Sequence, residues 1–338
     1  MDINRINPSE FIAAARPILD VRSPGEYTHG HIPGAISFPL FSDEERAKVG
    51  TCYKQVSKEA ALIQGLEIVG PKMAGFVRAA MQLAPDRKIA VHCWRGGQRS
   101  GSMAWLFQQA GFDVVTLRGG YKAYRGCVLE GFTGRQLDIR IVGGKTGSGK
   151  TKILHAMRDC GAQIIDLEGL ACHKGSAFGF IGEQPQPTVE QFENELFKIF
   201  EALDPSLPVW LENESHSIGR IFIPDGLWHQ MKTAPLYHIE IPQEARIGNL
   251  LEDYVIEHTN DLRHAFQKIA SKLGGLRLKN ALIALDEGNF AAAAAIALEY
   301  YDKTYQHGLD TSVSQDIRKF QFDFGDSTQI ARALKNHE

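Results

Sequence analysis

The sequence has no long hydrophobic run and no recognisable leader. No stretch approaches the roughly eighteen apolar residues that a membrane-spanning helix needs. The first residues, Met1-Asp-Ile-Asn-Arg5, carry neither the basic nor the apolar region of a signal peptide. We therefore expect a cytoplasmic protein without a membrane partner.

Cysteine is also scarce. Five cysteines occur in 338 residues, which is an odd number, and they are widely spaced without a C-x-x-C pair. This pattern argues against a disulfide framework and against a structural zinc site. We expect reduced thiols at all five positions, which are Cys52, Cys93, Cys127, Cys160 and Cys172.

The chain has no excess of positive charge, because its formal net charge is −3. Basic residues are nevertheless concentrated locally. Residues 116–152 contain eight Lys or Arg against Glu130 and Asp138, and residues 261–280 contain five against Asp261. Such patches bind phosphate backbones even on a protein that is acidic overall. For the second patch, a solvated helix face is an equally good interpretation.

What is present is the composition of a globular protein, with 43% hydrophobic and 23% charged residues. Strand and helix patterns alternate over residues 1–130 and again over 135–338, separated by a glycine-containing polar stretch at 126–134. This alternation predicts two α/β domains with mostly parallel sheets. Residues 243–307 are predicted to be helical, and the alanine run at 291–295 is interpreted as packed helix.

The segment at residues 92–100 reads His-Cys-Trp-Arg-Gly-Gly-Gln-Arg-Ser and lies between an apolar run and a helical pattern. A cysteine after a strand is usually a small buried hydrophobe. Here two glycines allow successive backbone N–H groups to point inward, and two arginines add positive charge. These features favour a reactive thiolate. The predicted catalytic residues are Cys93, Arg95 and Arg99.

The segment at residues 144–151, Gly-Lys-Thr-Gly-Ser-Gly-Lys-Thr, fits the phosphate-loop motif G-x-x-x-x-G-K-[ST] at every fixed position. A strand pattern precedes it and a helical pattern follows. Such a loop binds a polyphosphate, which need not be ATP, through backbone N–H groups and a lysine. Thr151 is predicted to hold Mg²⁺. The predicted phosphate-binding residues are Gly144, Thr146, Gly147, Ser148, Gly149, Lys150 and Thr151.

Two later strand patterns, at residues 163–167 and 207–211, end in carboxylates. Asp166, Glu168 and Glu212 should therefore lie near the phosphate loop, as Mg²⁺ ligands or water-orienting bases. The alternative is a capping or turn carboxylate. A polar segment between these strands is predicted to close over substrate through His173, Lys174 and Ser176.

The N-terminal third resembles a rhodanese domain in its motifs and their order: residues 19–22 (Leu-Asp-Val-Arg), Glu26, residues 30–35 (Gly-His-Ile-Pro-Gly-Ala), the Cys93 loop and residues 117–121 (Leu-Arg-Gly-Gly-Tyr). With the phosphate loop and the motifs at residues 50–55, 166–170, 173–179 and 299–302, the whole chain resembles the bacterial tRNA 2-selenouridine synthase family. Lys174, where Arg is usual, Asn213 and His216 depart from the family pattern. The resemblance implies a rhodanese-like domain followed by a P-loop NTPase-like α/β domain.

The resemblance also implies a transferase activity on tRNA. Members of this family replace the sulfur of 2-thiouridine at the wobble position with selenium from selenophosphate. The replacement resembles S-geranylation with geranyl diphosphate followed by exchange of the geranylthio group. By this resemblance, the phosphate loop with Mg²⁺ on Thr151 would hold the diphosphate. Cys93 would bind selenophosphate or carry selenium as a perselenide.

Two other interpretations remain open from the residues. His92-Cys93, five further residues and Arg99-Ser100 also satisfy the cysteine phosphatase pattern, although no sequence position identifies the acid that such an enzyme needs. The chain also fits a rhodanese-type sulfurtransferase or sulfur carrier coupled to a nucleotide-binding domain.

Overall fold

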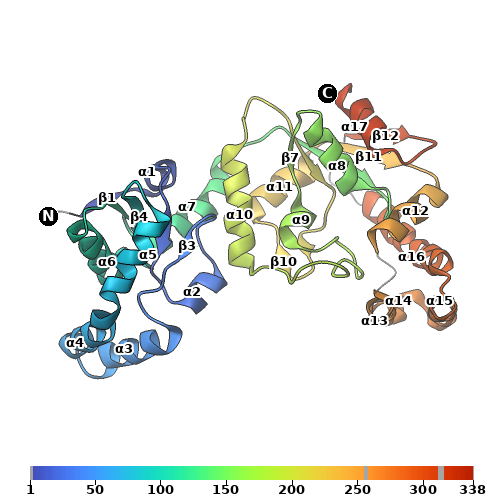
Figure 1. Ribbon diagram of the computed structural model, residues 1–338. Helices are drawn as coiled ribbons and strands as arrows, with labels where there is room; N and C mark the ends of the chain where they lie inside the picture. Colours follow the sequence, from blue (N-terminus) through green and yellow to red (C-terminus); the bar gives the residue numbers. More distant parts are fainter. Residues whose placement is uncertain (1–2, 255–257, 311–315, 338) are drawn as a thin grey trace. The chain divides into compact units, whose positions relative to one another are not determined.

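The computed structural model describes residues 3–254, 258–310 and 316–337 (Figure 1). It divides into two compact units, residues 1–131 and 132–338. Among the described residues, no helix has the length and apolar character needed to cross a membrane. All five cysteines are free thiols, as expected.

The first unit is built on a five-stranded sheet in the order β1-β5-β4-β2-β3, in which every neighbouring pair is parallel. The predicted parallel α/β sheet is confirmed. Strand β1 was not predicted, because it is a three-residue edge strand with two exposed residues and no apolar pattern. The strands are β1 (Asn4–Ile6), β2 (Ile18–Asp20), β3 (Ile36–Ser37), β4 (Lys88–His92) and β5 (Asp113–Leu117).

Helices fill the connections between these strands. The long connection between β3 and β4 is helical. It begins with a capping box in which Ser42 Oγ accepts from Glu45 N and Glu45 Oε2 accepts from Ser42 N. A short 3-10 turn at Gly70-Pro71 interrupts it. The helices are α1 (Pro8–Ala13), α2 (Pro24–His29), α3 (Asp43–Gln55), α4 (Lys58–Val69), η1 (Gly70–Lys72), α5 (Met73–Leu83) and α6 (Gln98–Gln109).

The glycine-containing stretch at 126–134, expected to be a polar separator, is instead helical and belongs to α7 (Gly120–Gly134). Four buried side chains recur at helical spacing along it and outweigh the low helix propensity of its glycines. They are Tyr121, Tyr124, Val128 and Phe132.

The second unit contains another fully parallel sheet, in the order β12-β11-β6-β8-β7. Strand β6 lies at its centre and carries the phosphate loop at its carboxyl end. The strands are β6 (Ile139–Gly144), β7 (Gln163–Ile165), β8 (Val209–Glu212), β11 (Leu236–Glu240) and β12 (Ile317–Gln321). A small antiparallel pair, β9 (Ser217–Ile218) with β10 (Ile221–Phe222), was not predicted.

Helices α8 (Lys150–Asp159), α9 (Leu167–Ala171), α10 (Val189–Ala202), α11 (Asp225–Thr233) and α17 (Ser327–Lys335) belong to this unit (Figure 1). The predicted helical region at 243–307 is confirmed where it is described, since residues 255–257 lie outside the described residues. It contains α12 (Gln243–Asp253), α13 (Thr259–Lys268), α14 (Ala270–Leu273), α15 (Gly275–Asp286) and α16 (Phe290–Asp310). These helices enclose an apolar cluster with Phe178 and Phe266 inside it.

Candidate functional site

The cysteine loop follows β4, and α6 begins directly after it at Gln98. Cys93 is buried with 3% of its surface exposed, and its Sγ lies 3.2 Å from Ser100 Oγ. Gly96 has a φ of +66°, and a Cβ there would lie 2.7 Å from the carbonyl oxygen of Leu117. The loop therefore requires glycine at this position.

A second glycine-containing segment, residues 117–121, lies against the cysteine loop. Tyr121 N donates to Cys93 O at 2.9 Å. A Cβ on Gly120 would collide with Cys93 O and Gly96 N. The two motifs from distant parts of the sequence thus form one rigid backbone cradle around Cys93.

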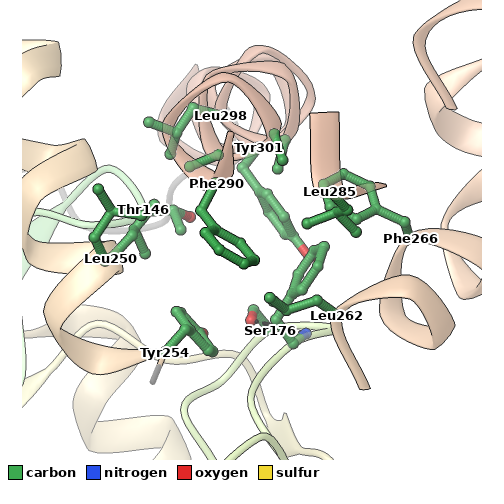
Figure 2. A pocket seen from close by; sticks show the side chains of 15 residues that line it. Thr146, Ser176, Leu250, Tyr254, Leu262, Phe266, Leu285, Phe290, Leu298 and Tyr301 are labelled. Atoms are coloured by element: carbon green, nitrogen blue, oxygen red, sulfur yellow. Dashed lines mark hydrogen bonds between the residues drawn. The ribbon is translucent and has the colours of Figure 1, made fainter. Parts of the chain in front are cut away.

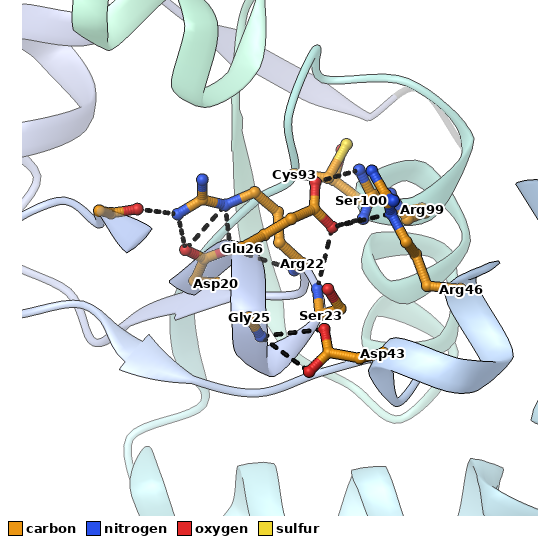
Figure 3. A network of polar contacts seen from close by, with 11 residues as sticks. Asp20, Arg22, Ser23, Gly25, Glu26, Asp43, Arg46, Cys93, Arg99 and Ser100 are labelled. Carbon is orange, nitrogen blue, oxygen red and sulfur yellow. Dashed lines mark hydrogen bonds and ion pairs between the residues drawn. The ribbon is translucent and has the colours of Figure 1, made fainter. Parts of the chain in front are cut away.

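The two arginines of the loop lie in different surroundings (Figure 3). Arg95 is exposed. Arg99 donates from Nη1 to Glu26 Oε2 at 2.6 Å, and Arg46 lies 3.6 Å from the same oxygen. The charge of Arg99 near the thiol is therefore partly compensated by Glu26, which the sequence did not identify as a partner.

Glu26 is held in its ionised form. Burial by itself would raise the pKa of this carboxyl, but the hydrogen bond and the positive charge of Arg99 outweigh burial and lower it. A carboxylate of this kind orients an arginine well and gives up no proton near neutral pH.

The phosphate loop has the backbone that its glycines predict. Gly147 and Gly149 have φ values of +81° and +76°, in the region that favours glycine. Ser148 is buried, and its hydroxyl has no hydrogen-bond partner among the described atoms. Lys150 begins α8, so the loop's N–H groups and the helix N-terminus are available to an anion.

Side chains of helix α12 donate hydrogen bonds to the backbone of the phosphate loop. Arg246 Nε donates to Thr146 O and Asn249 Nδ2 donates to Gly147 O, each at 2.9 Å. Arg246 is 4% exposed and forms a bidentate pair with Asp302 of α16, at 2.9 and 2.5 Å. The loop is thereby held in place before any ligand binds, which reduces the ordering cost of binding.

Two of the predicted carboxylates connect to the loop through hydrogen bonds. Thr151 Oγ1 donates to Glu168 Oε2 at 2.8 Å, and Glu168 N donates to Glu212 Oε1 at 2.7 Å. Glu214, two residues after the end of β8, is hydrogen-bonded to Glu168 and also lies within reach of the Lys150 charge. The structure thus brings Glu168, Glu212 and Glu214 together beside Thr151.

Crowding of these carboxyls changes their protonation. Burial, followed by the negative charges of Asp166 and Glu168, raises the pKa of Glu212 to about 8. Burial and the charge of Glu168 also raise the pKa of Glu214 well above its usual range, although Lys150 opposes this shift. Near neutral pH this cluster therefore holds protons that isolated glutamates would have lost.

Asp166 plays the capping role that was the alternative interpretation. Its Oδ1 accepts from Gly169 N at 2.7 Å, at the start of α9. Its other oxygen, Oδ2, lies 2.7 Å from His155 Nε2 of α8. Asp166 lines the same cavity as Thr151, but its two oxygens already have protein partners.

The segment containing His173, Lys174 and Ser176 packs against the rest of the unit. Lys174 Nζ donates to Asp253 O at 3.0 Å and lies 3.2 Å from Glu183 Oε1. His173 Nδ1 is buried without a partner among the described atoms, and burial lowers the pKa of this histidine. Lys174 and Ser176 line the cavity at the phosphate loop, whereas His173 lines a different cavity. Closure of this segment over substrate stays a prediction.

Residues of the phosphate loop line several cavities, and two of these cavities adjoin each other. The first, of about 400 Å³, is lined by many polar and charged residues, among them Lys150, Thr151, Glu168 and Glu214. The second, of about 60 Å³, is almost entirely apolar (Figure 2). They adjoin, because both are lined by Thr146, Ser176, Leu250, Tyr254 and Tyr301.

The apolar cavity was missed from the sequence. Its residues come from α12, α13, α15 and α16 and from the segment at 176–178, so no single stretch reveals it. A signal was present in α16, where small and aromatic residues share one helical face. The alanine run at 291–295 is packed helix as expected, but it also contributes Ala293 and Ala294 to the cavity wall.

The donor set near Thr151 fits Mg²⁺ only as part of a ligand complex. The Thr151 hydroxyl and the Glu168 carboxylate are oxygen donors of the kind that this ion takes. Within the described ranges, no group of three or more His, Cys, Asp or Glu side chains is arranged to hold a metal. Mg²⁺ usually keeps several waters and binds substrate phosphates, so two protein oxygens at a phosphate loop are compatible with it.

Glu212 provides a test of this electrostatic arrangement. The folded chain binds its proton more tightly than the unfolded chain does, so the free energy of unfolding should fall as the pH rises from 4.5 to about 8. The fall should be on the order of 4 kcal/mol. Glu212→Gln cannot titrate and should lose that fall in urea unfolding between pH 5 and 9. Glu201→Gln, at an exposed position of α10, is the control and should behave like the unaltered protein. An unchanged pH profile in Glu212→Gln would contradict the assignment.

Known proteins resemble this chain over most of its length. The family model described as tRNA 2-selenouridine synthase AAA domain matches residues 137–338, and the rhodanese-like domain model matches residues 7–127. A tRNA 2-selenouridine synthase of Bdellovibrio bacteriovorus is 35% identical and covers 87% of this chain and 89% of the relative. The relative of the same name in Nitrosomonas europaea is 31% identical, over 97% of this chain and 87% of its own length.

A solved crystal structure is also similar. It is the N-terminal domain of a protein from Clostridium difficile 630 named for ATP/GTP binding, 40% identical over 37% of this chain and 99% of that one, with a TM-score of 0.36. The family matches and the full-length relatives agree with the motifs at Cys93 and at residues 144–151. This chain therefore belongs to the tRNA 2-selenouridine synthase family.

Proposed function

We propose that this chain is a tRNA 2-selenouridine synthase that works through a geranylated intermediate. One observation carries the choice of donor: the phosphate loop adjoins an apolar cavity. A geranyl diphosphate needs both a site for two phosphates and a dry site for a branched hydrocarbon chain. A nucleoside triphosphate has a polar sugar next to its phosphates and would gain nothing from that cavity.

The first reaction is alkylation of the 2-thiouridine sulfur. The sulfur attacks C1 of geranyl diphosphate, the C1–O bond breaks, and the diphosphate leaves with the bonding electrons while the N3 proton passes to solvent. Backbone N–H groups of residues 146–151 and the Lys150 ammonium stabilise the charge on the departing diphosphate. Mg²⁺ bound through Thr151 and the phosphates would neutralise part of that charge.

In the second reaction the selenium of selenophosphate attacks C2, the geranylthio group leaves as geranylthiol, and water then cleaves the Se–P bond and releases phosphate. A thiocarbonyl sulfur is a poor leaving group, whereas an alkylated sulfur departs as a thiol, so alkylation prepares C2 for attack by a selenium nucleophile. We assign the handling of selenophosphate to the Cys93 cradle, where backbone N–H groups and Arg95 suit an anion. Arg99 has a positioning role, because Glu26 holds it.

The alternative of a cysteine phosphatase has less support. Such an enzyme protonates its leaving group with a general acid. Glu26, the carboxyl that pairs with Arg99, has a lowered pKa and is bound to two arginines (Figure 3). It is therefore poorly suited to that role.

The macromolecular substrate in this proposal is a tRNA with 2-thiouridine at the wobble position, in the cytoplasm. The basic residues at 116–152 and 261–280 are the candidate contacts for its phosphates. Lys268 and Lys272 of the second group line a cavity of about 860 Å³ together with Arg220, which is consistent with an anionic ligand.

Mass spectrometry of the tRNA tests this function directly. The purified chain is incubated with 2-thiouridine tRNA and geranyl diphosphate, and selenophosphate is added afterwards. We expect the geranylated nucleoside first and 2-selenouridine second, without ATP. The same tRNA lacking the thio group is the control. An unchanged thiouridine, or a requirement for ATP hydrolysis during geranylation, would overturn the proposal.

A further inference from the structure

The apolar cavity has one wall made of a single helix face. One face of α16 carries side chains at successive spacings of three and one residues, so they share one side of the helix: Phe290, Ala293, Ala294, Ala297, Leu298 and Tyr301. Three of these six side chains are methyl groups. The cavity exists where these small residues leave space between larger ones.

The opposite end of the cavity is closed by bulky side chains. Phe266 and Leu285 are 2% and 3% exposed, and Phe178 packs edge-on against Phe266 with ring centroids 5.0 Å apart. Figure 2 shows Thr146 of the phosphate loop on one side of the cavity and Phe266 with Leu285 on the other, with Phe290 between them. The cavity therefore extends from the phosphate loop to a wall of bulky side chains.

We propose that this cavity measures the length of the isoprenoid chain, with Phe290 and Ala294 as specificity-determining residues. The inference rests on the proposed function, since it requires an isoprenyl diphosphate at the phosphate loop. The cavity is small, about 60 Å³. An apolar cavity of about 150 Å³ just accommodates benzene, so this one has room for only a short terminal segment of a chain.

A closed apolar cavity of this kind can discriminate between isoprenoid chains of different length. In this proposal a ten-carbon chain fills the apolar cavity, a five-carbon chain fills less of it, and a fifteen-carbon chain meets Phe266 and Leu285. The interior of a protein is closely packed, so a longer chain would force side chains from their rotamers. The ten-carbon donor should therefore be preferred over both neighbours.

The decisive experiment measures kcat/KM for S-alkylation of 2-thiouridine tRNA with dimethylallyl, geranyl and farnesyl diphosphate. Ala294→Leu fills the cavity and should lower the preference for geranyl over dimethylallyl by at least about tenfold, since one methylene in a hydrophobic pocket commonly changes discrimination by about tenfold or more. Ala291→Leu is the matched control, because Ala291 lies on the exposed side of the same helix and lines neither cavity. It should keep the unaltered preference.

An enlarging variant tests the opposite direction. Phe290 is only half-buried at the first position of α16, so Phe290→Ala spares the central core, and it should raise the use of farnesyl relative to geranyl at least about tenfold. Binding of inorganic pyrophosphate should stay the same in all three variants, which shows that each has folded with an intact phosphate loop.

The outcomes separate this inference from the proposed function. If the unaltered chain alkylates thiouridine with none of the three donors, the proposed function fails. If it alkylates thiouridine but Ala294→Leu and Phe290→Ala have the same chain-length preference as Ala291→Leu, only the inference that the cavity selects chain length is overturned.

Discussion

Replacing Cys93 with alanine should abolish the formation of 2-selenouridine while geranylation of 2-thiouridine tRNA continues. The reason is that Cys93 lies in the first compact unit and the phosphate loop in the second, so each has its own backbone cradle. The thiol is a small buried group whose Sγ contacts Ser100 Oγ at 3.2 Å, and alanine removes the sulfur with little change in shape. Mass spectrometry of the tRNA after each step measures both activities on one sample.

The control for this variant is Cys160→Ala, which removes a half-buried thiol after α8 and should leave both activities in place. Thermal unfolding of the two variants checks that each retains its fold. Loss of both activities in a folded Cys93→Ala protein would show that the cysteine acts before or during alkylation, which contradicts its assignment to selenium.

Replacing Lys150 with alanine should give the complementary pattern. Removing a group that stabilises developing charge commonly costs about 10²- to 10³-fold in rate, and Lys150 is the ammonium expected to contact the departing diphosphate. Geranylation should fall by that factor. When S-geranyl-2-thiouridine tRNA is supplied ready-made, the variant should convert it to 2-selenouridine at the rate of the unaltered protein.

Lys303→Ala is the matched control for this prediction. Lys303 is exposed on α16 and does not line the cavities to which the phosphate loop contributes. Its geranylation rate should be unchanged. If Lys150→Ala geranylates normally, the phosphate loop is not the donor site. If it also fails on the pre-geranylated tRNA, the phosphate loop is needed for selenation as well. The assignment of geranylation to the phosphate loop and of selenation to the cysteine loop would then be wrong.

The two loops could be predicted because each is a contiguous motif whose geometry is local. Glycines at 147 and 149 allow positive φ values, and Lys150 and Thr151 start the next helix. The same holds for Gly96 in the cysteine loop. The short edge strand β1 and the helical separator at 126–134 could not be predicted equally well, because tertiary packing outweighs weak local preferences there.

The charge state of the site depends on residues that are distant in sequence. Arg99 meets Glu26 across 73 positions, so the sequence revealed an arginine beside Cys93 but not the carboxylate that holds it. Glu168 meets Glu212 across 44 positions, and only their burial together with Asp166 raises the pKa of Glu212 to about 8. Desolvation and mutual repulsion are properties of the folded environment, which no local pattern contains.

The sequence by itself determined the two α/β domains, the cysteine loop and the phosphate loop, since hydrophobic period, glycine position and motif spacing act over a few residues. Only the tertiary structure decided what surrounds them. The apolar cavity requires four helices, the phosphate loop and the segment at 176–178 to converge, and its volume is what remains after Phe266, Leu285 and the alanines of α16 have packed. A cavity is defined by the absence of atoms from several segments at once, so it emerges only when those segments have assembled.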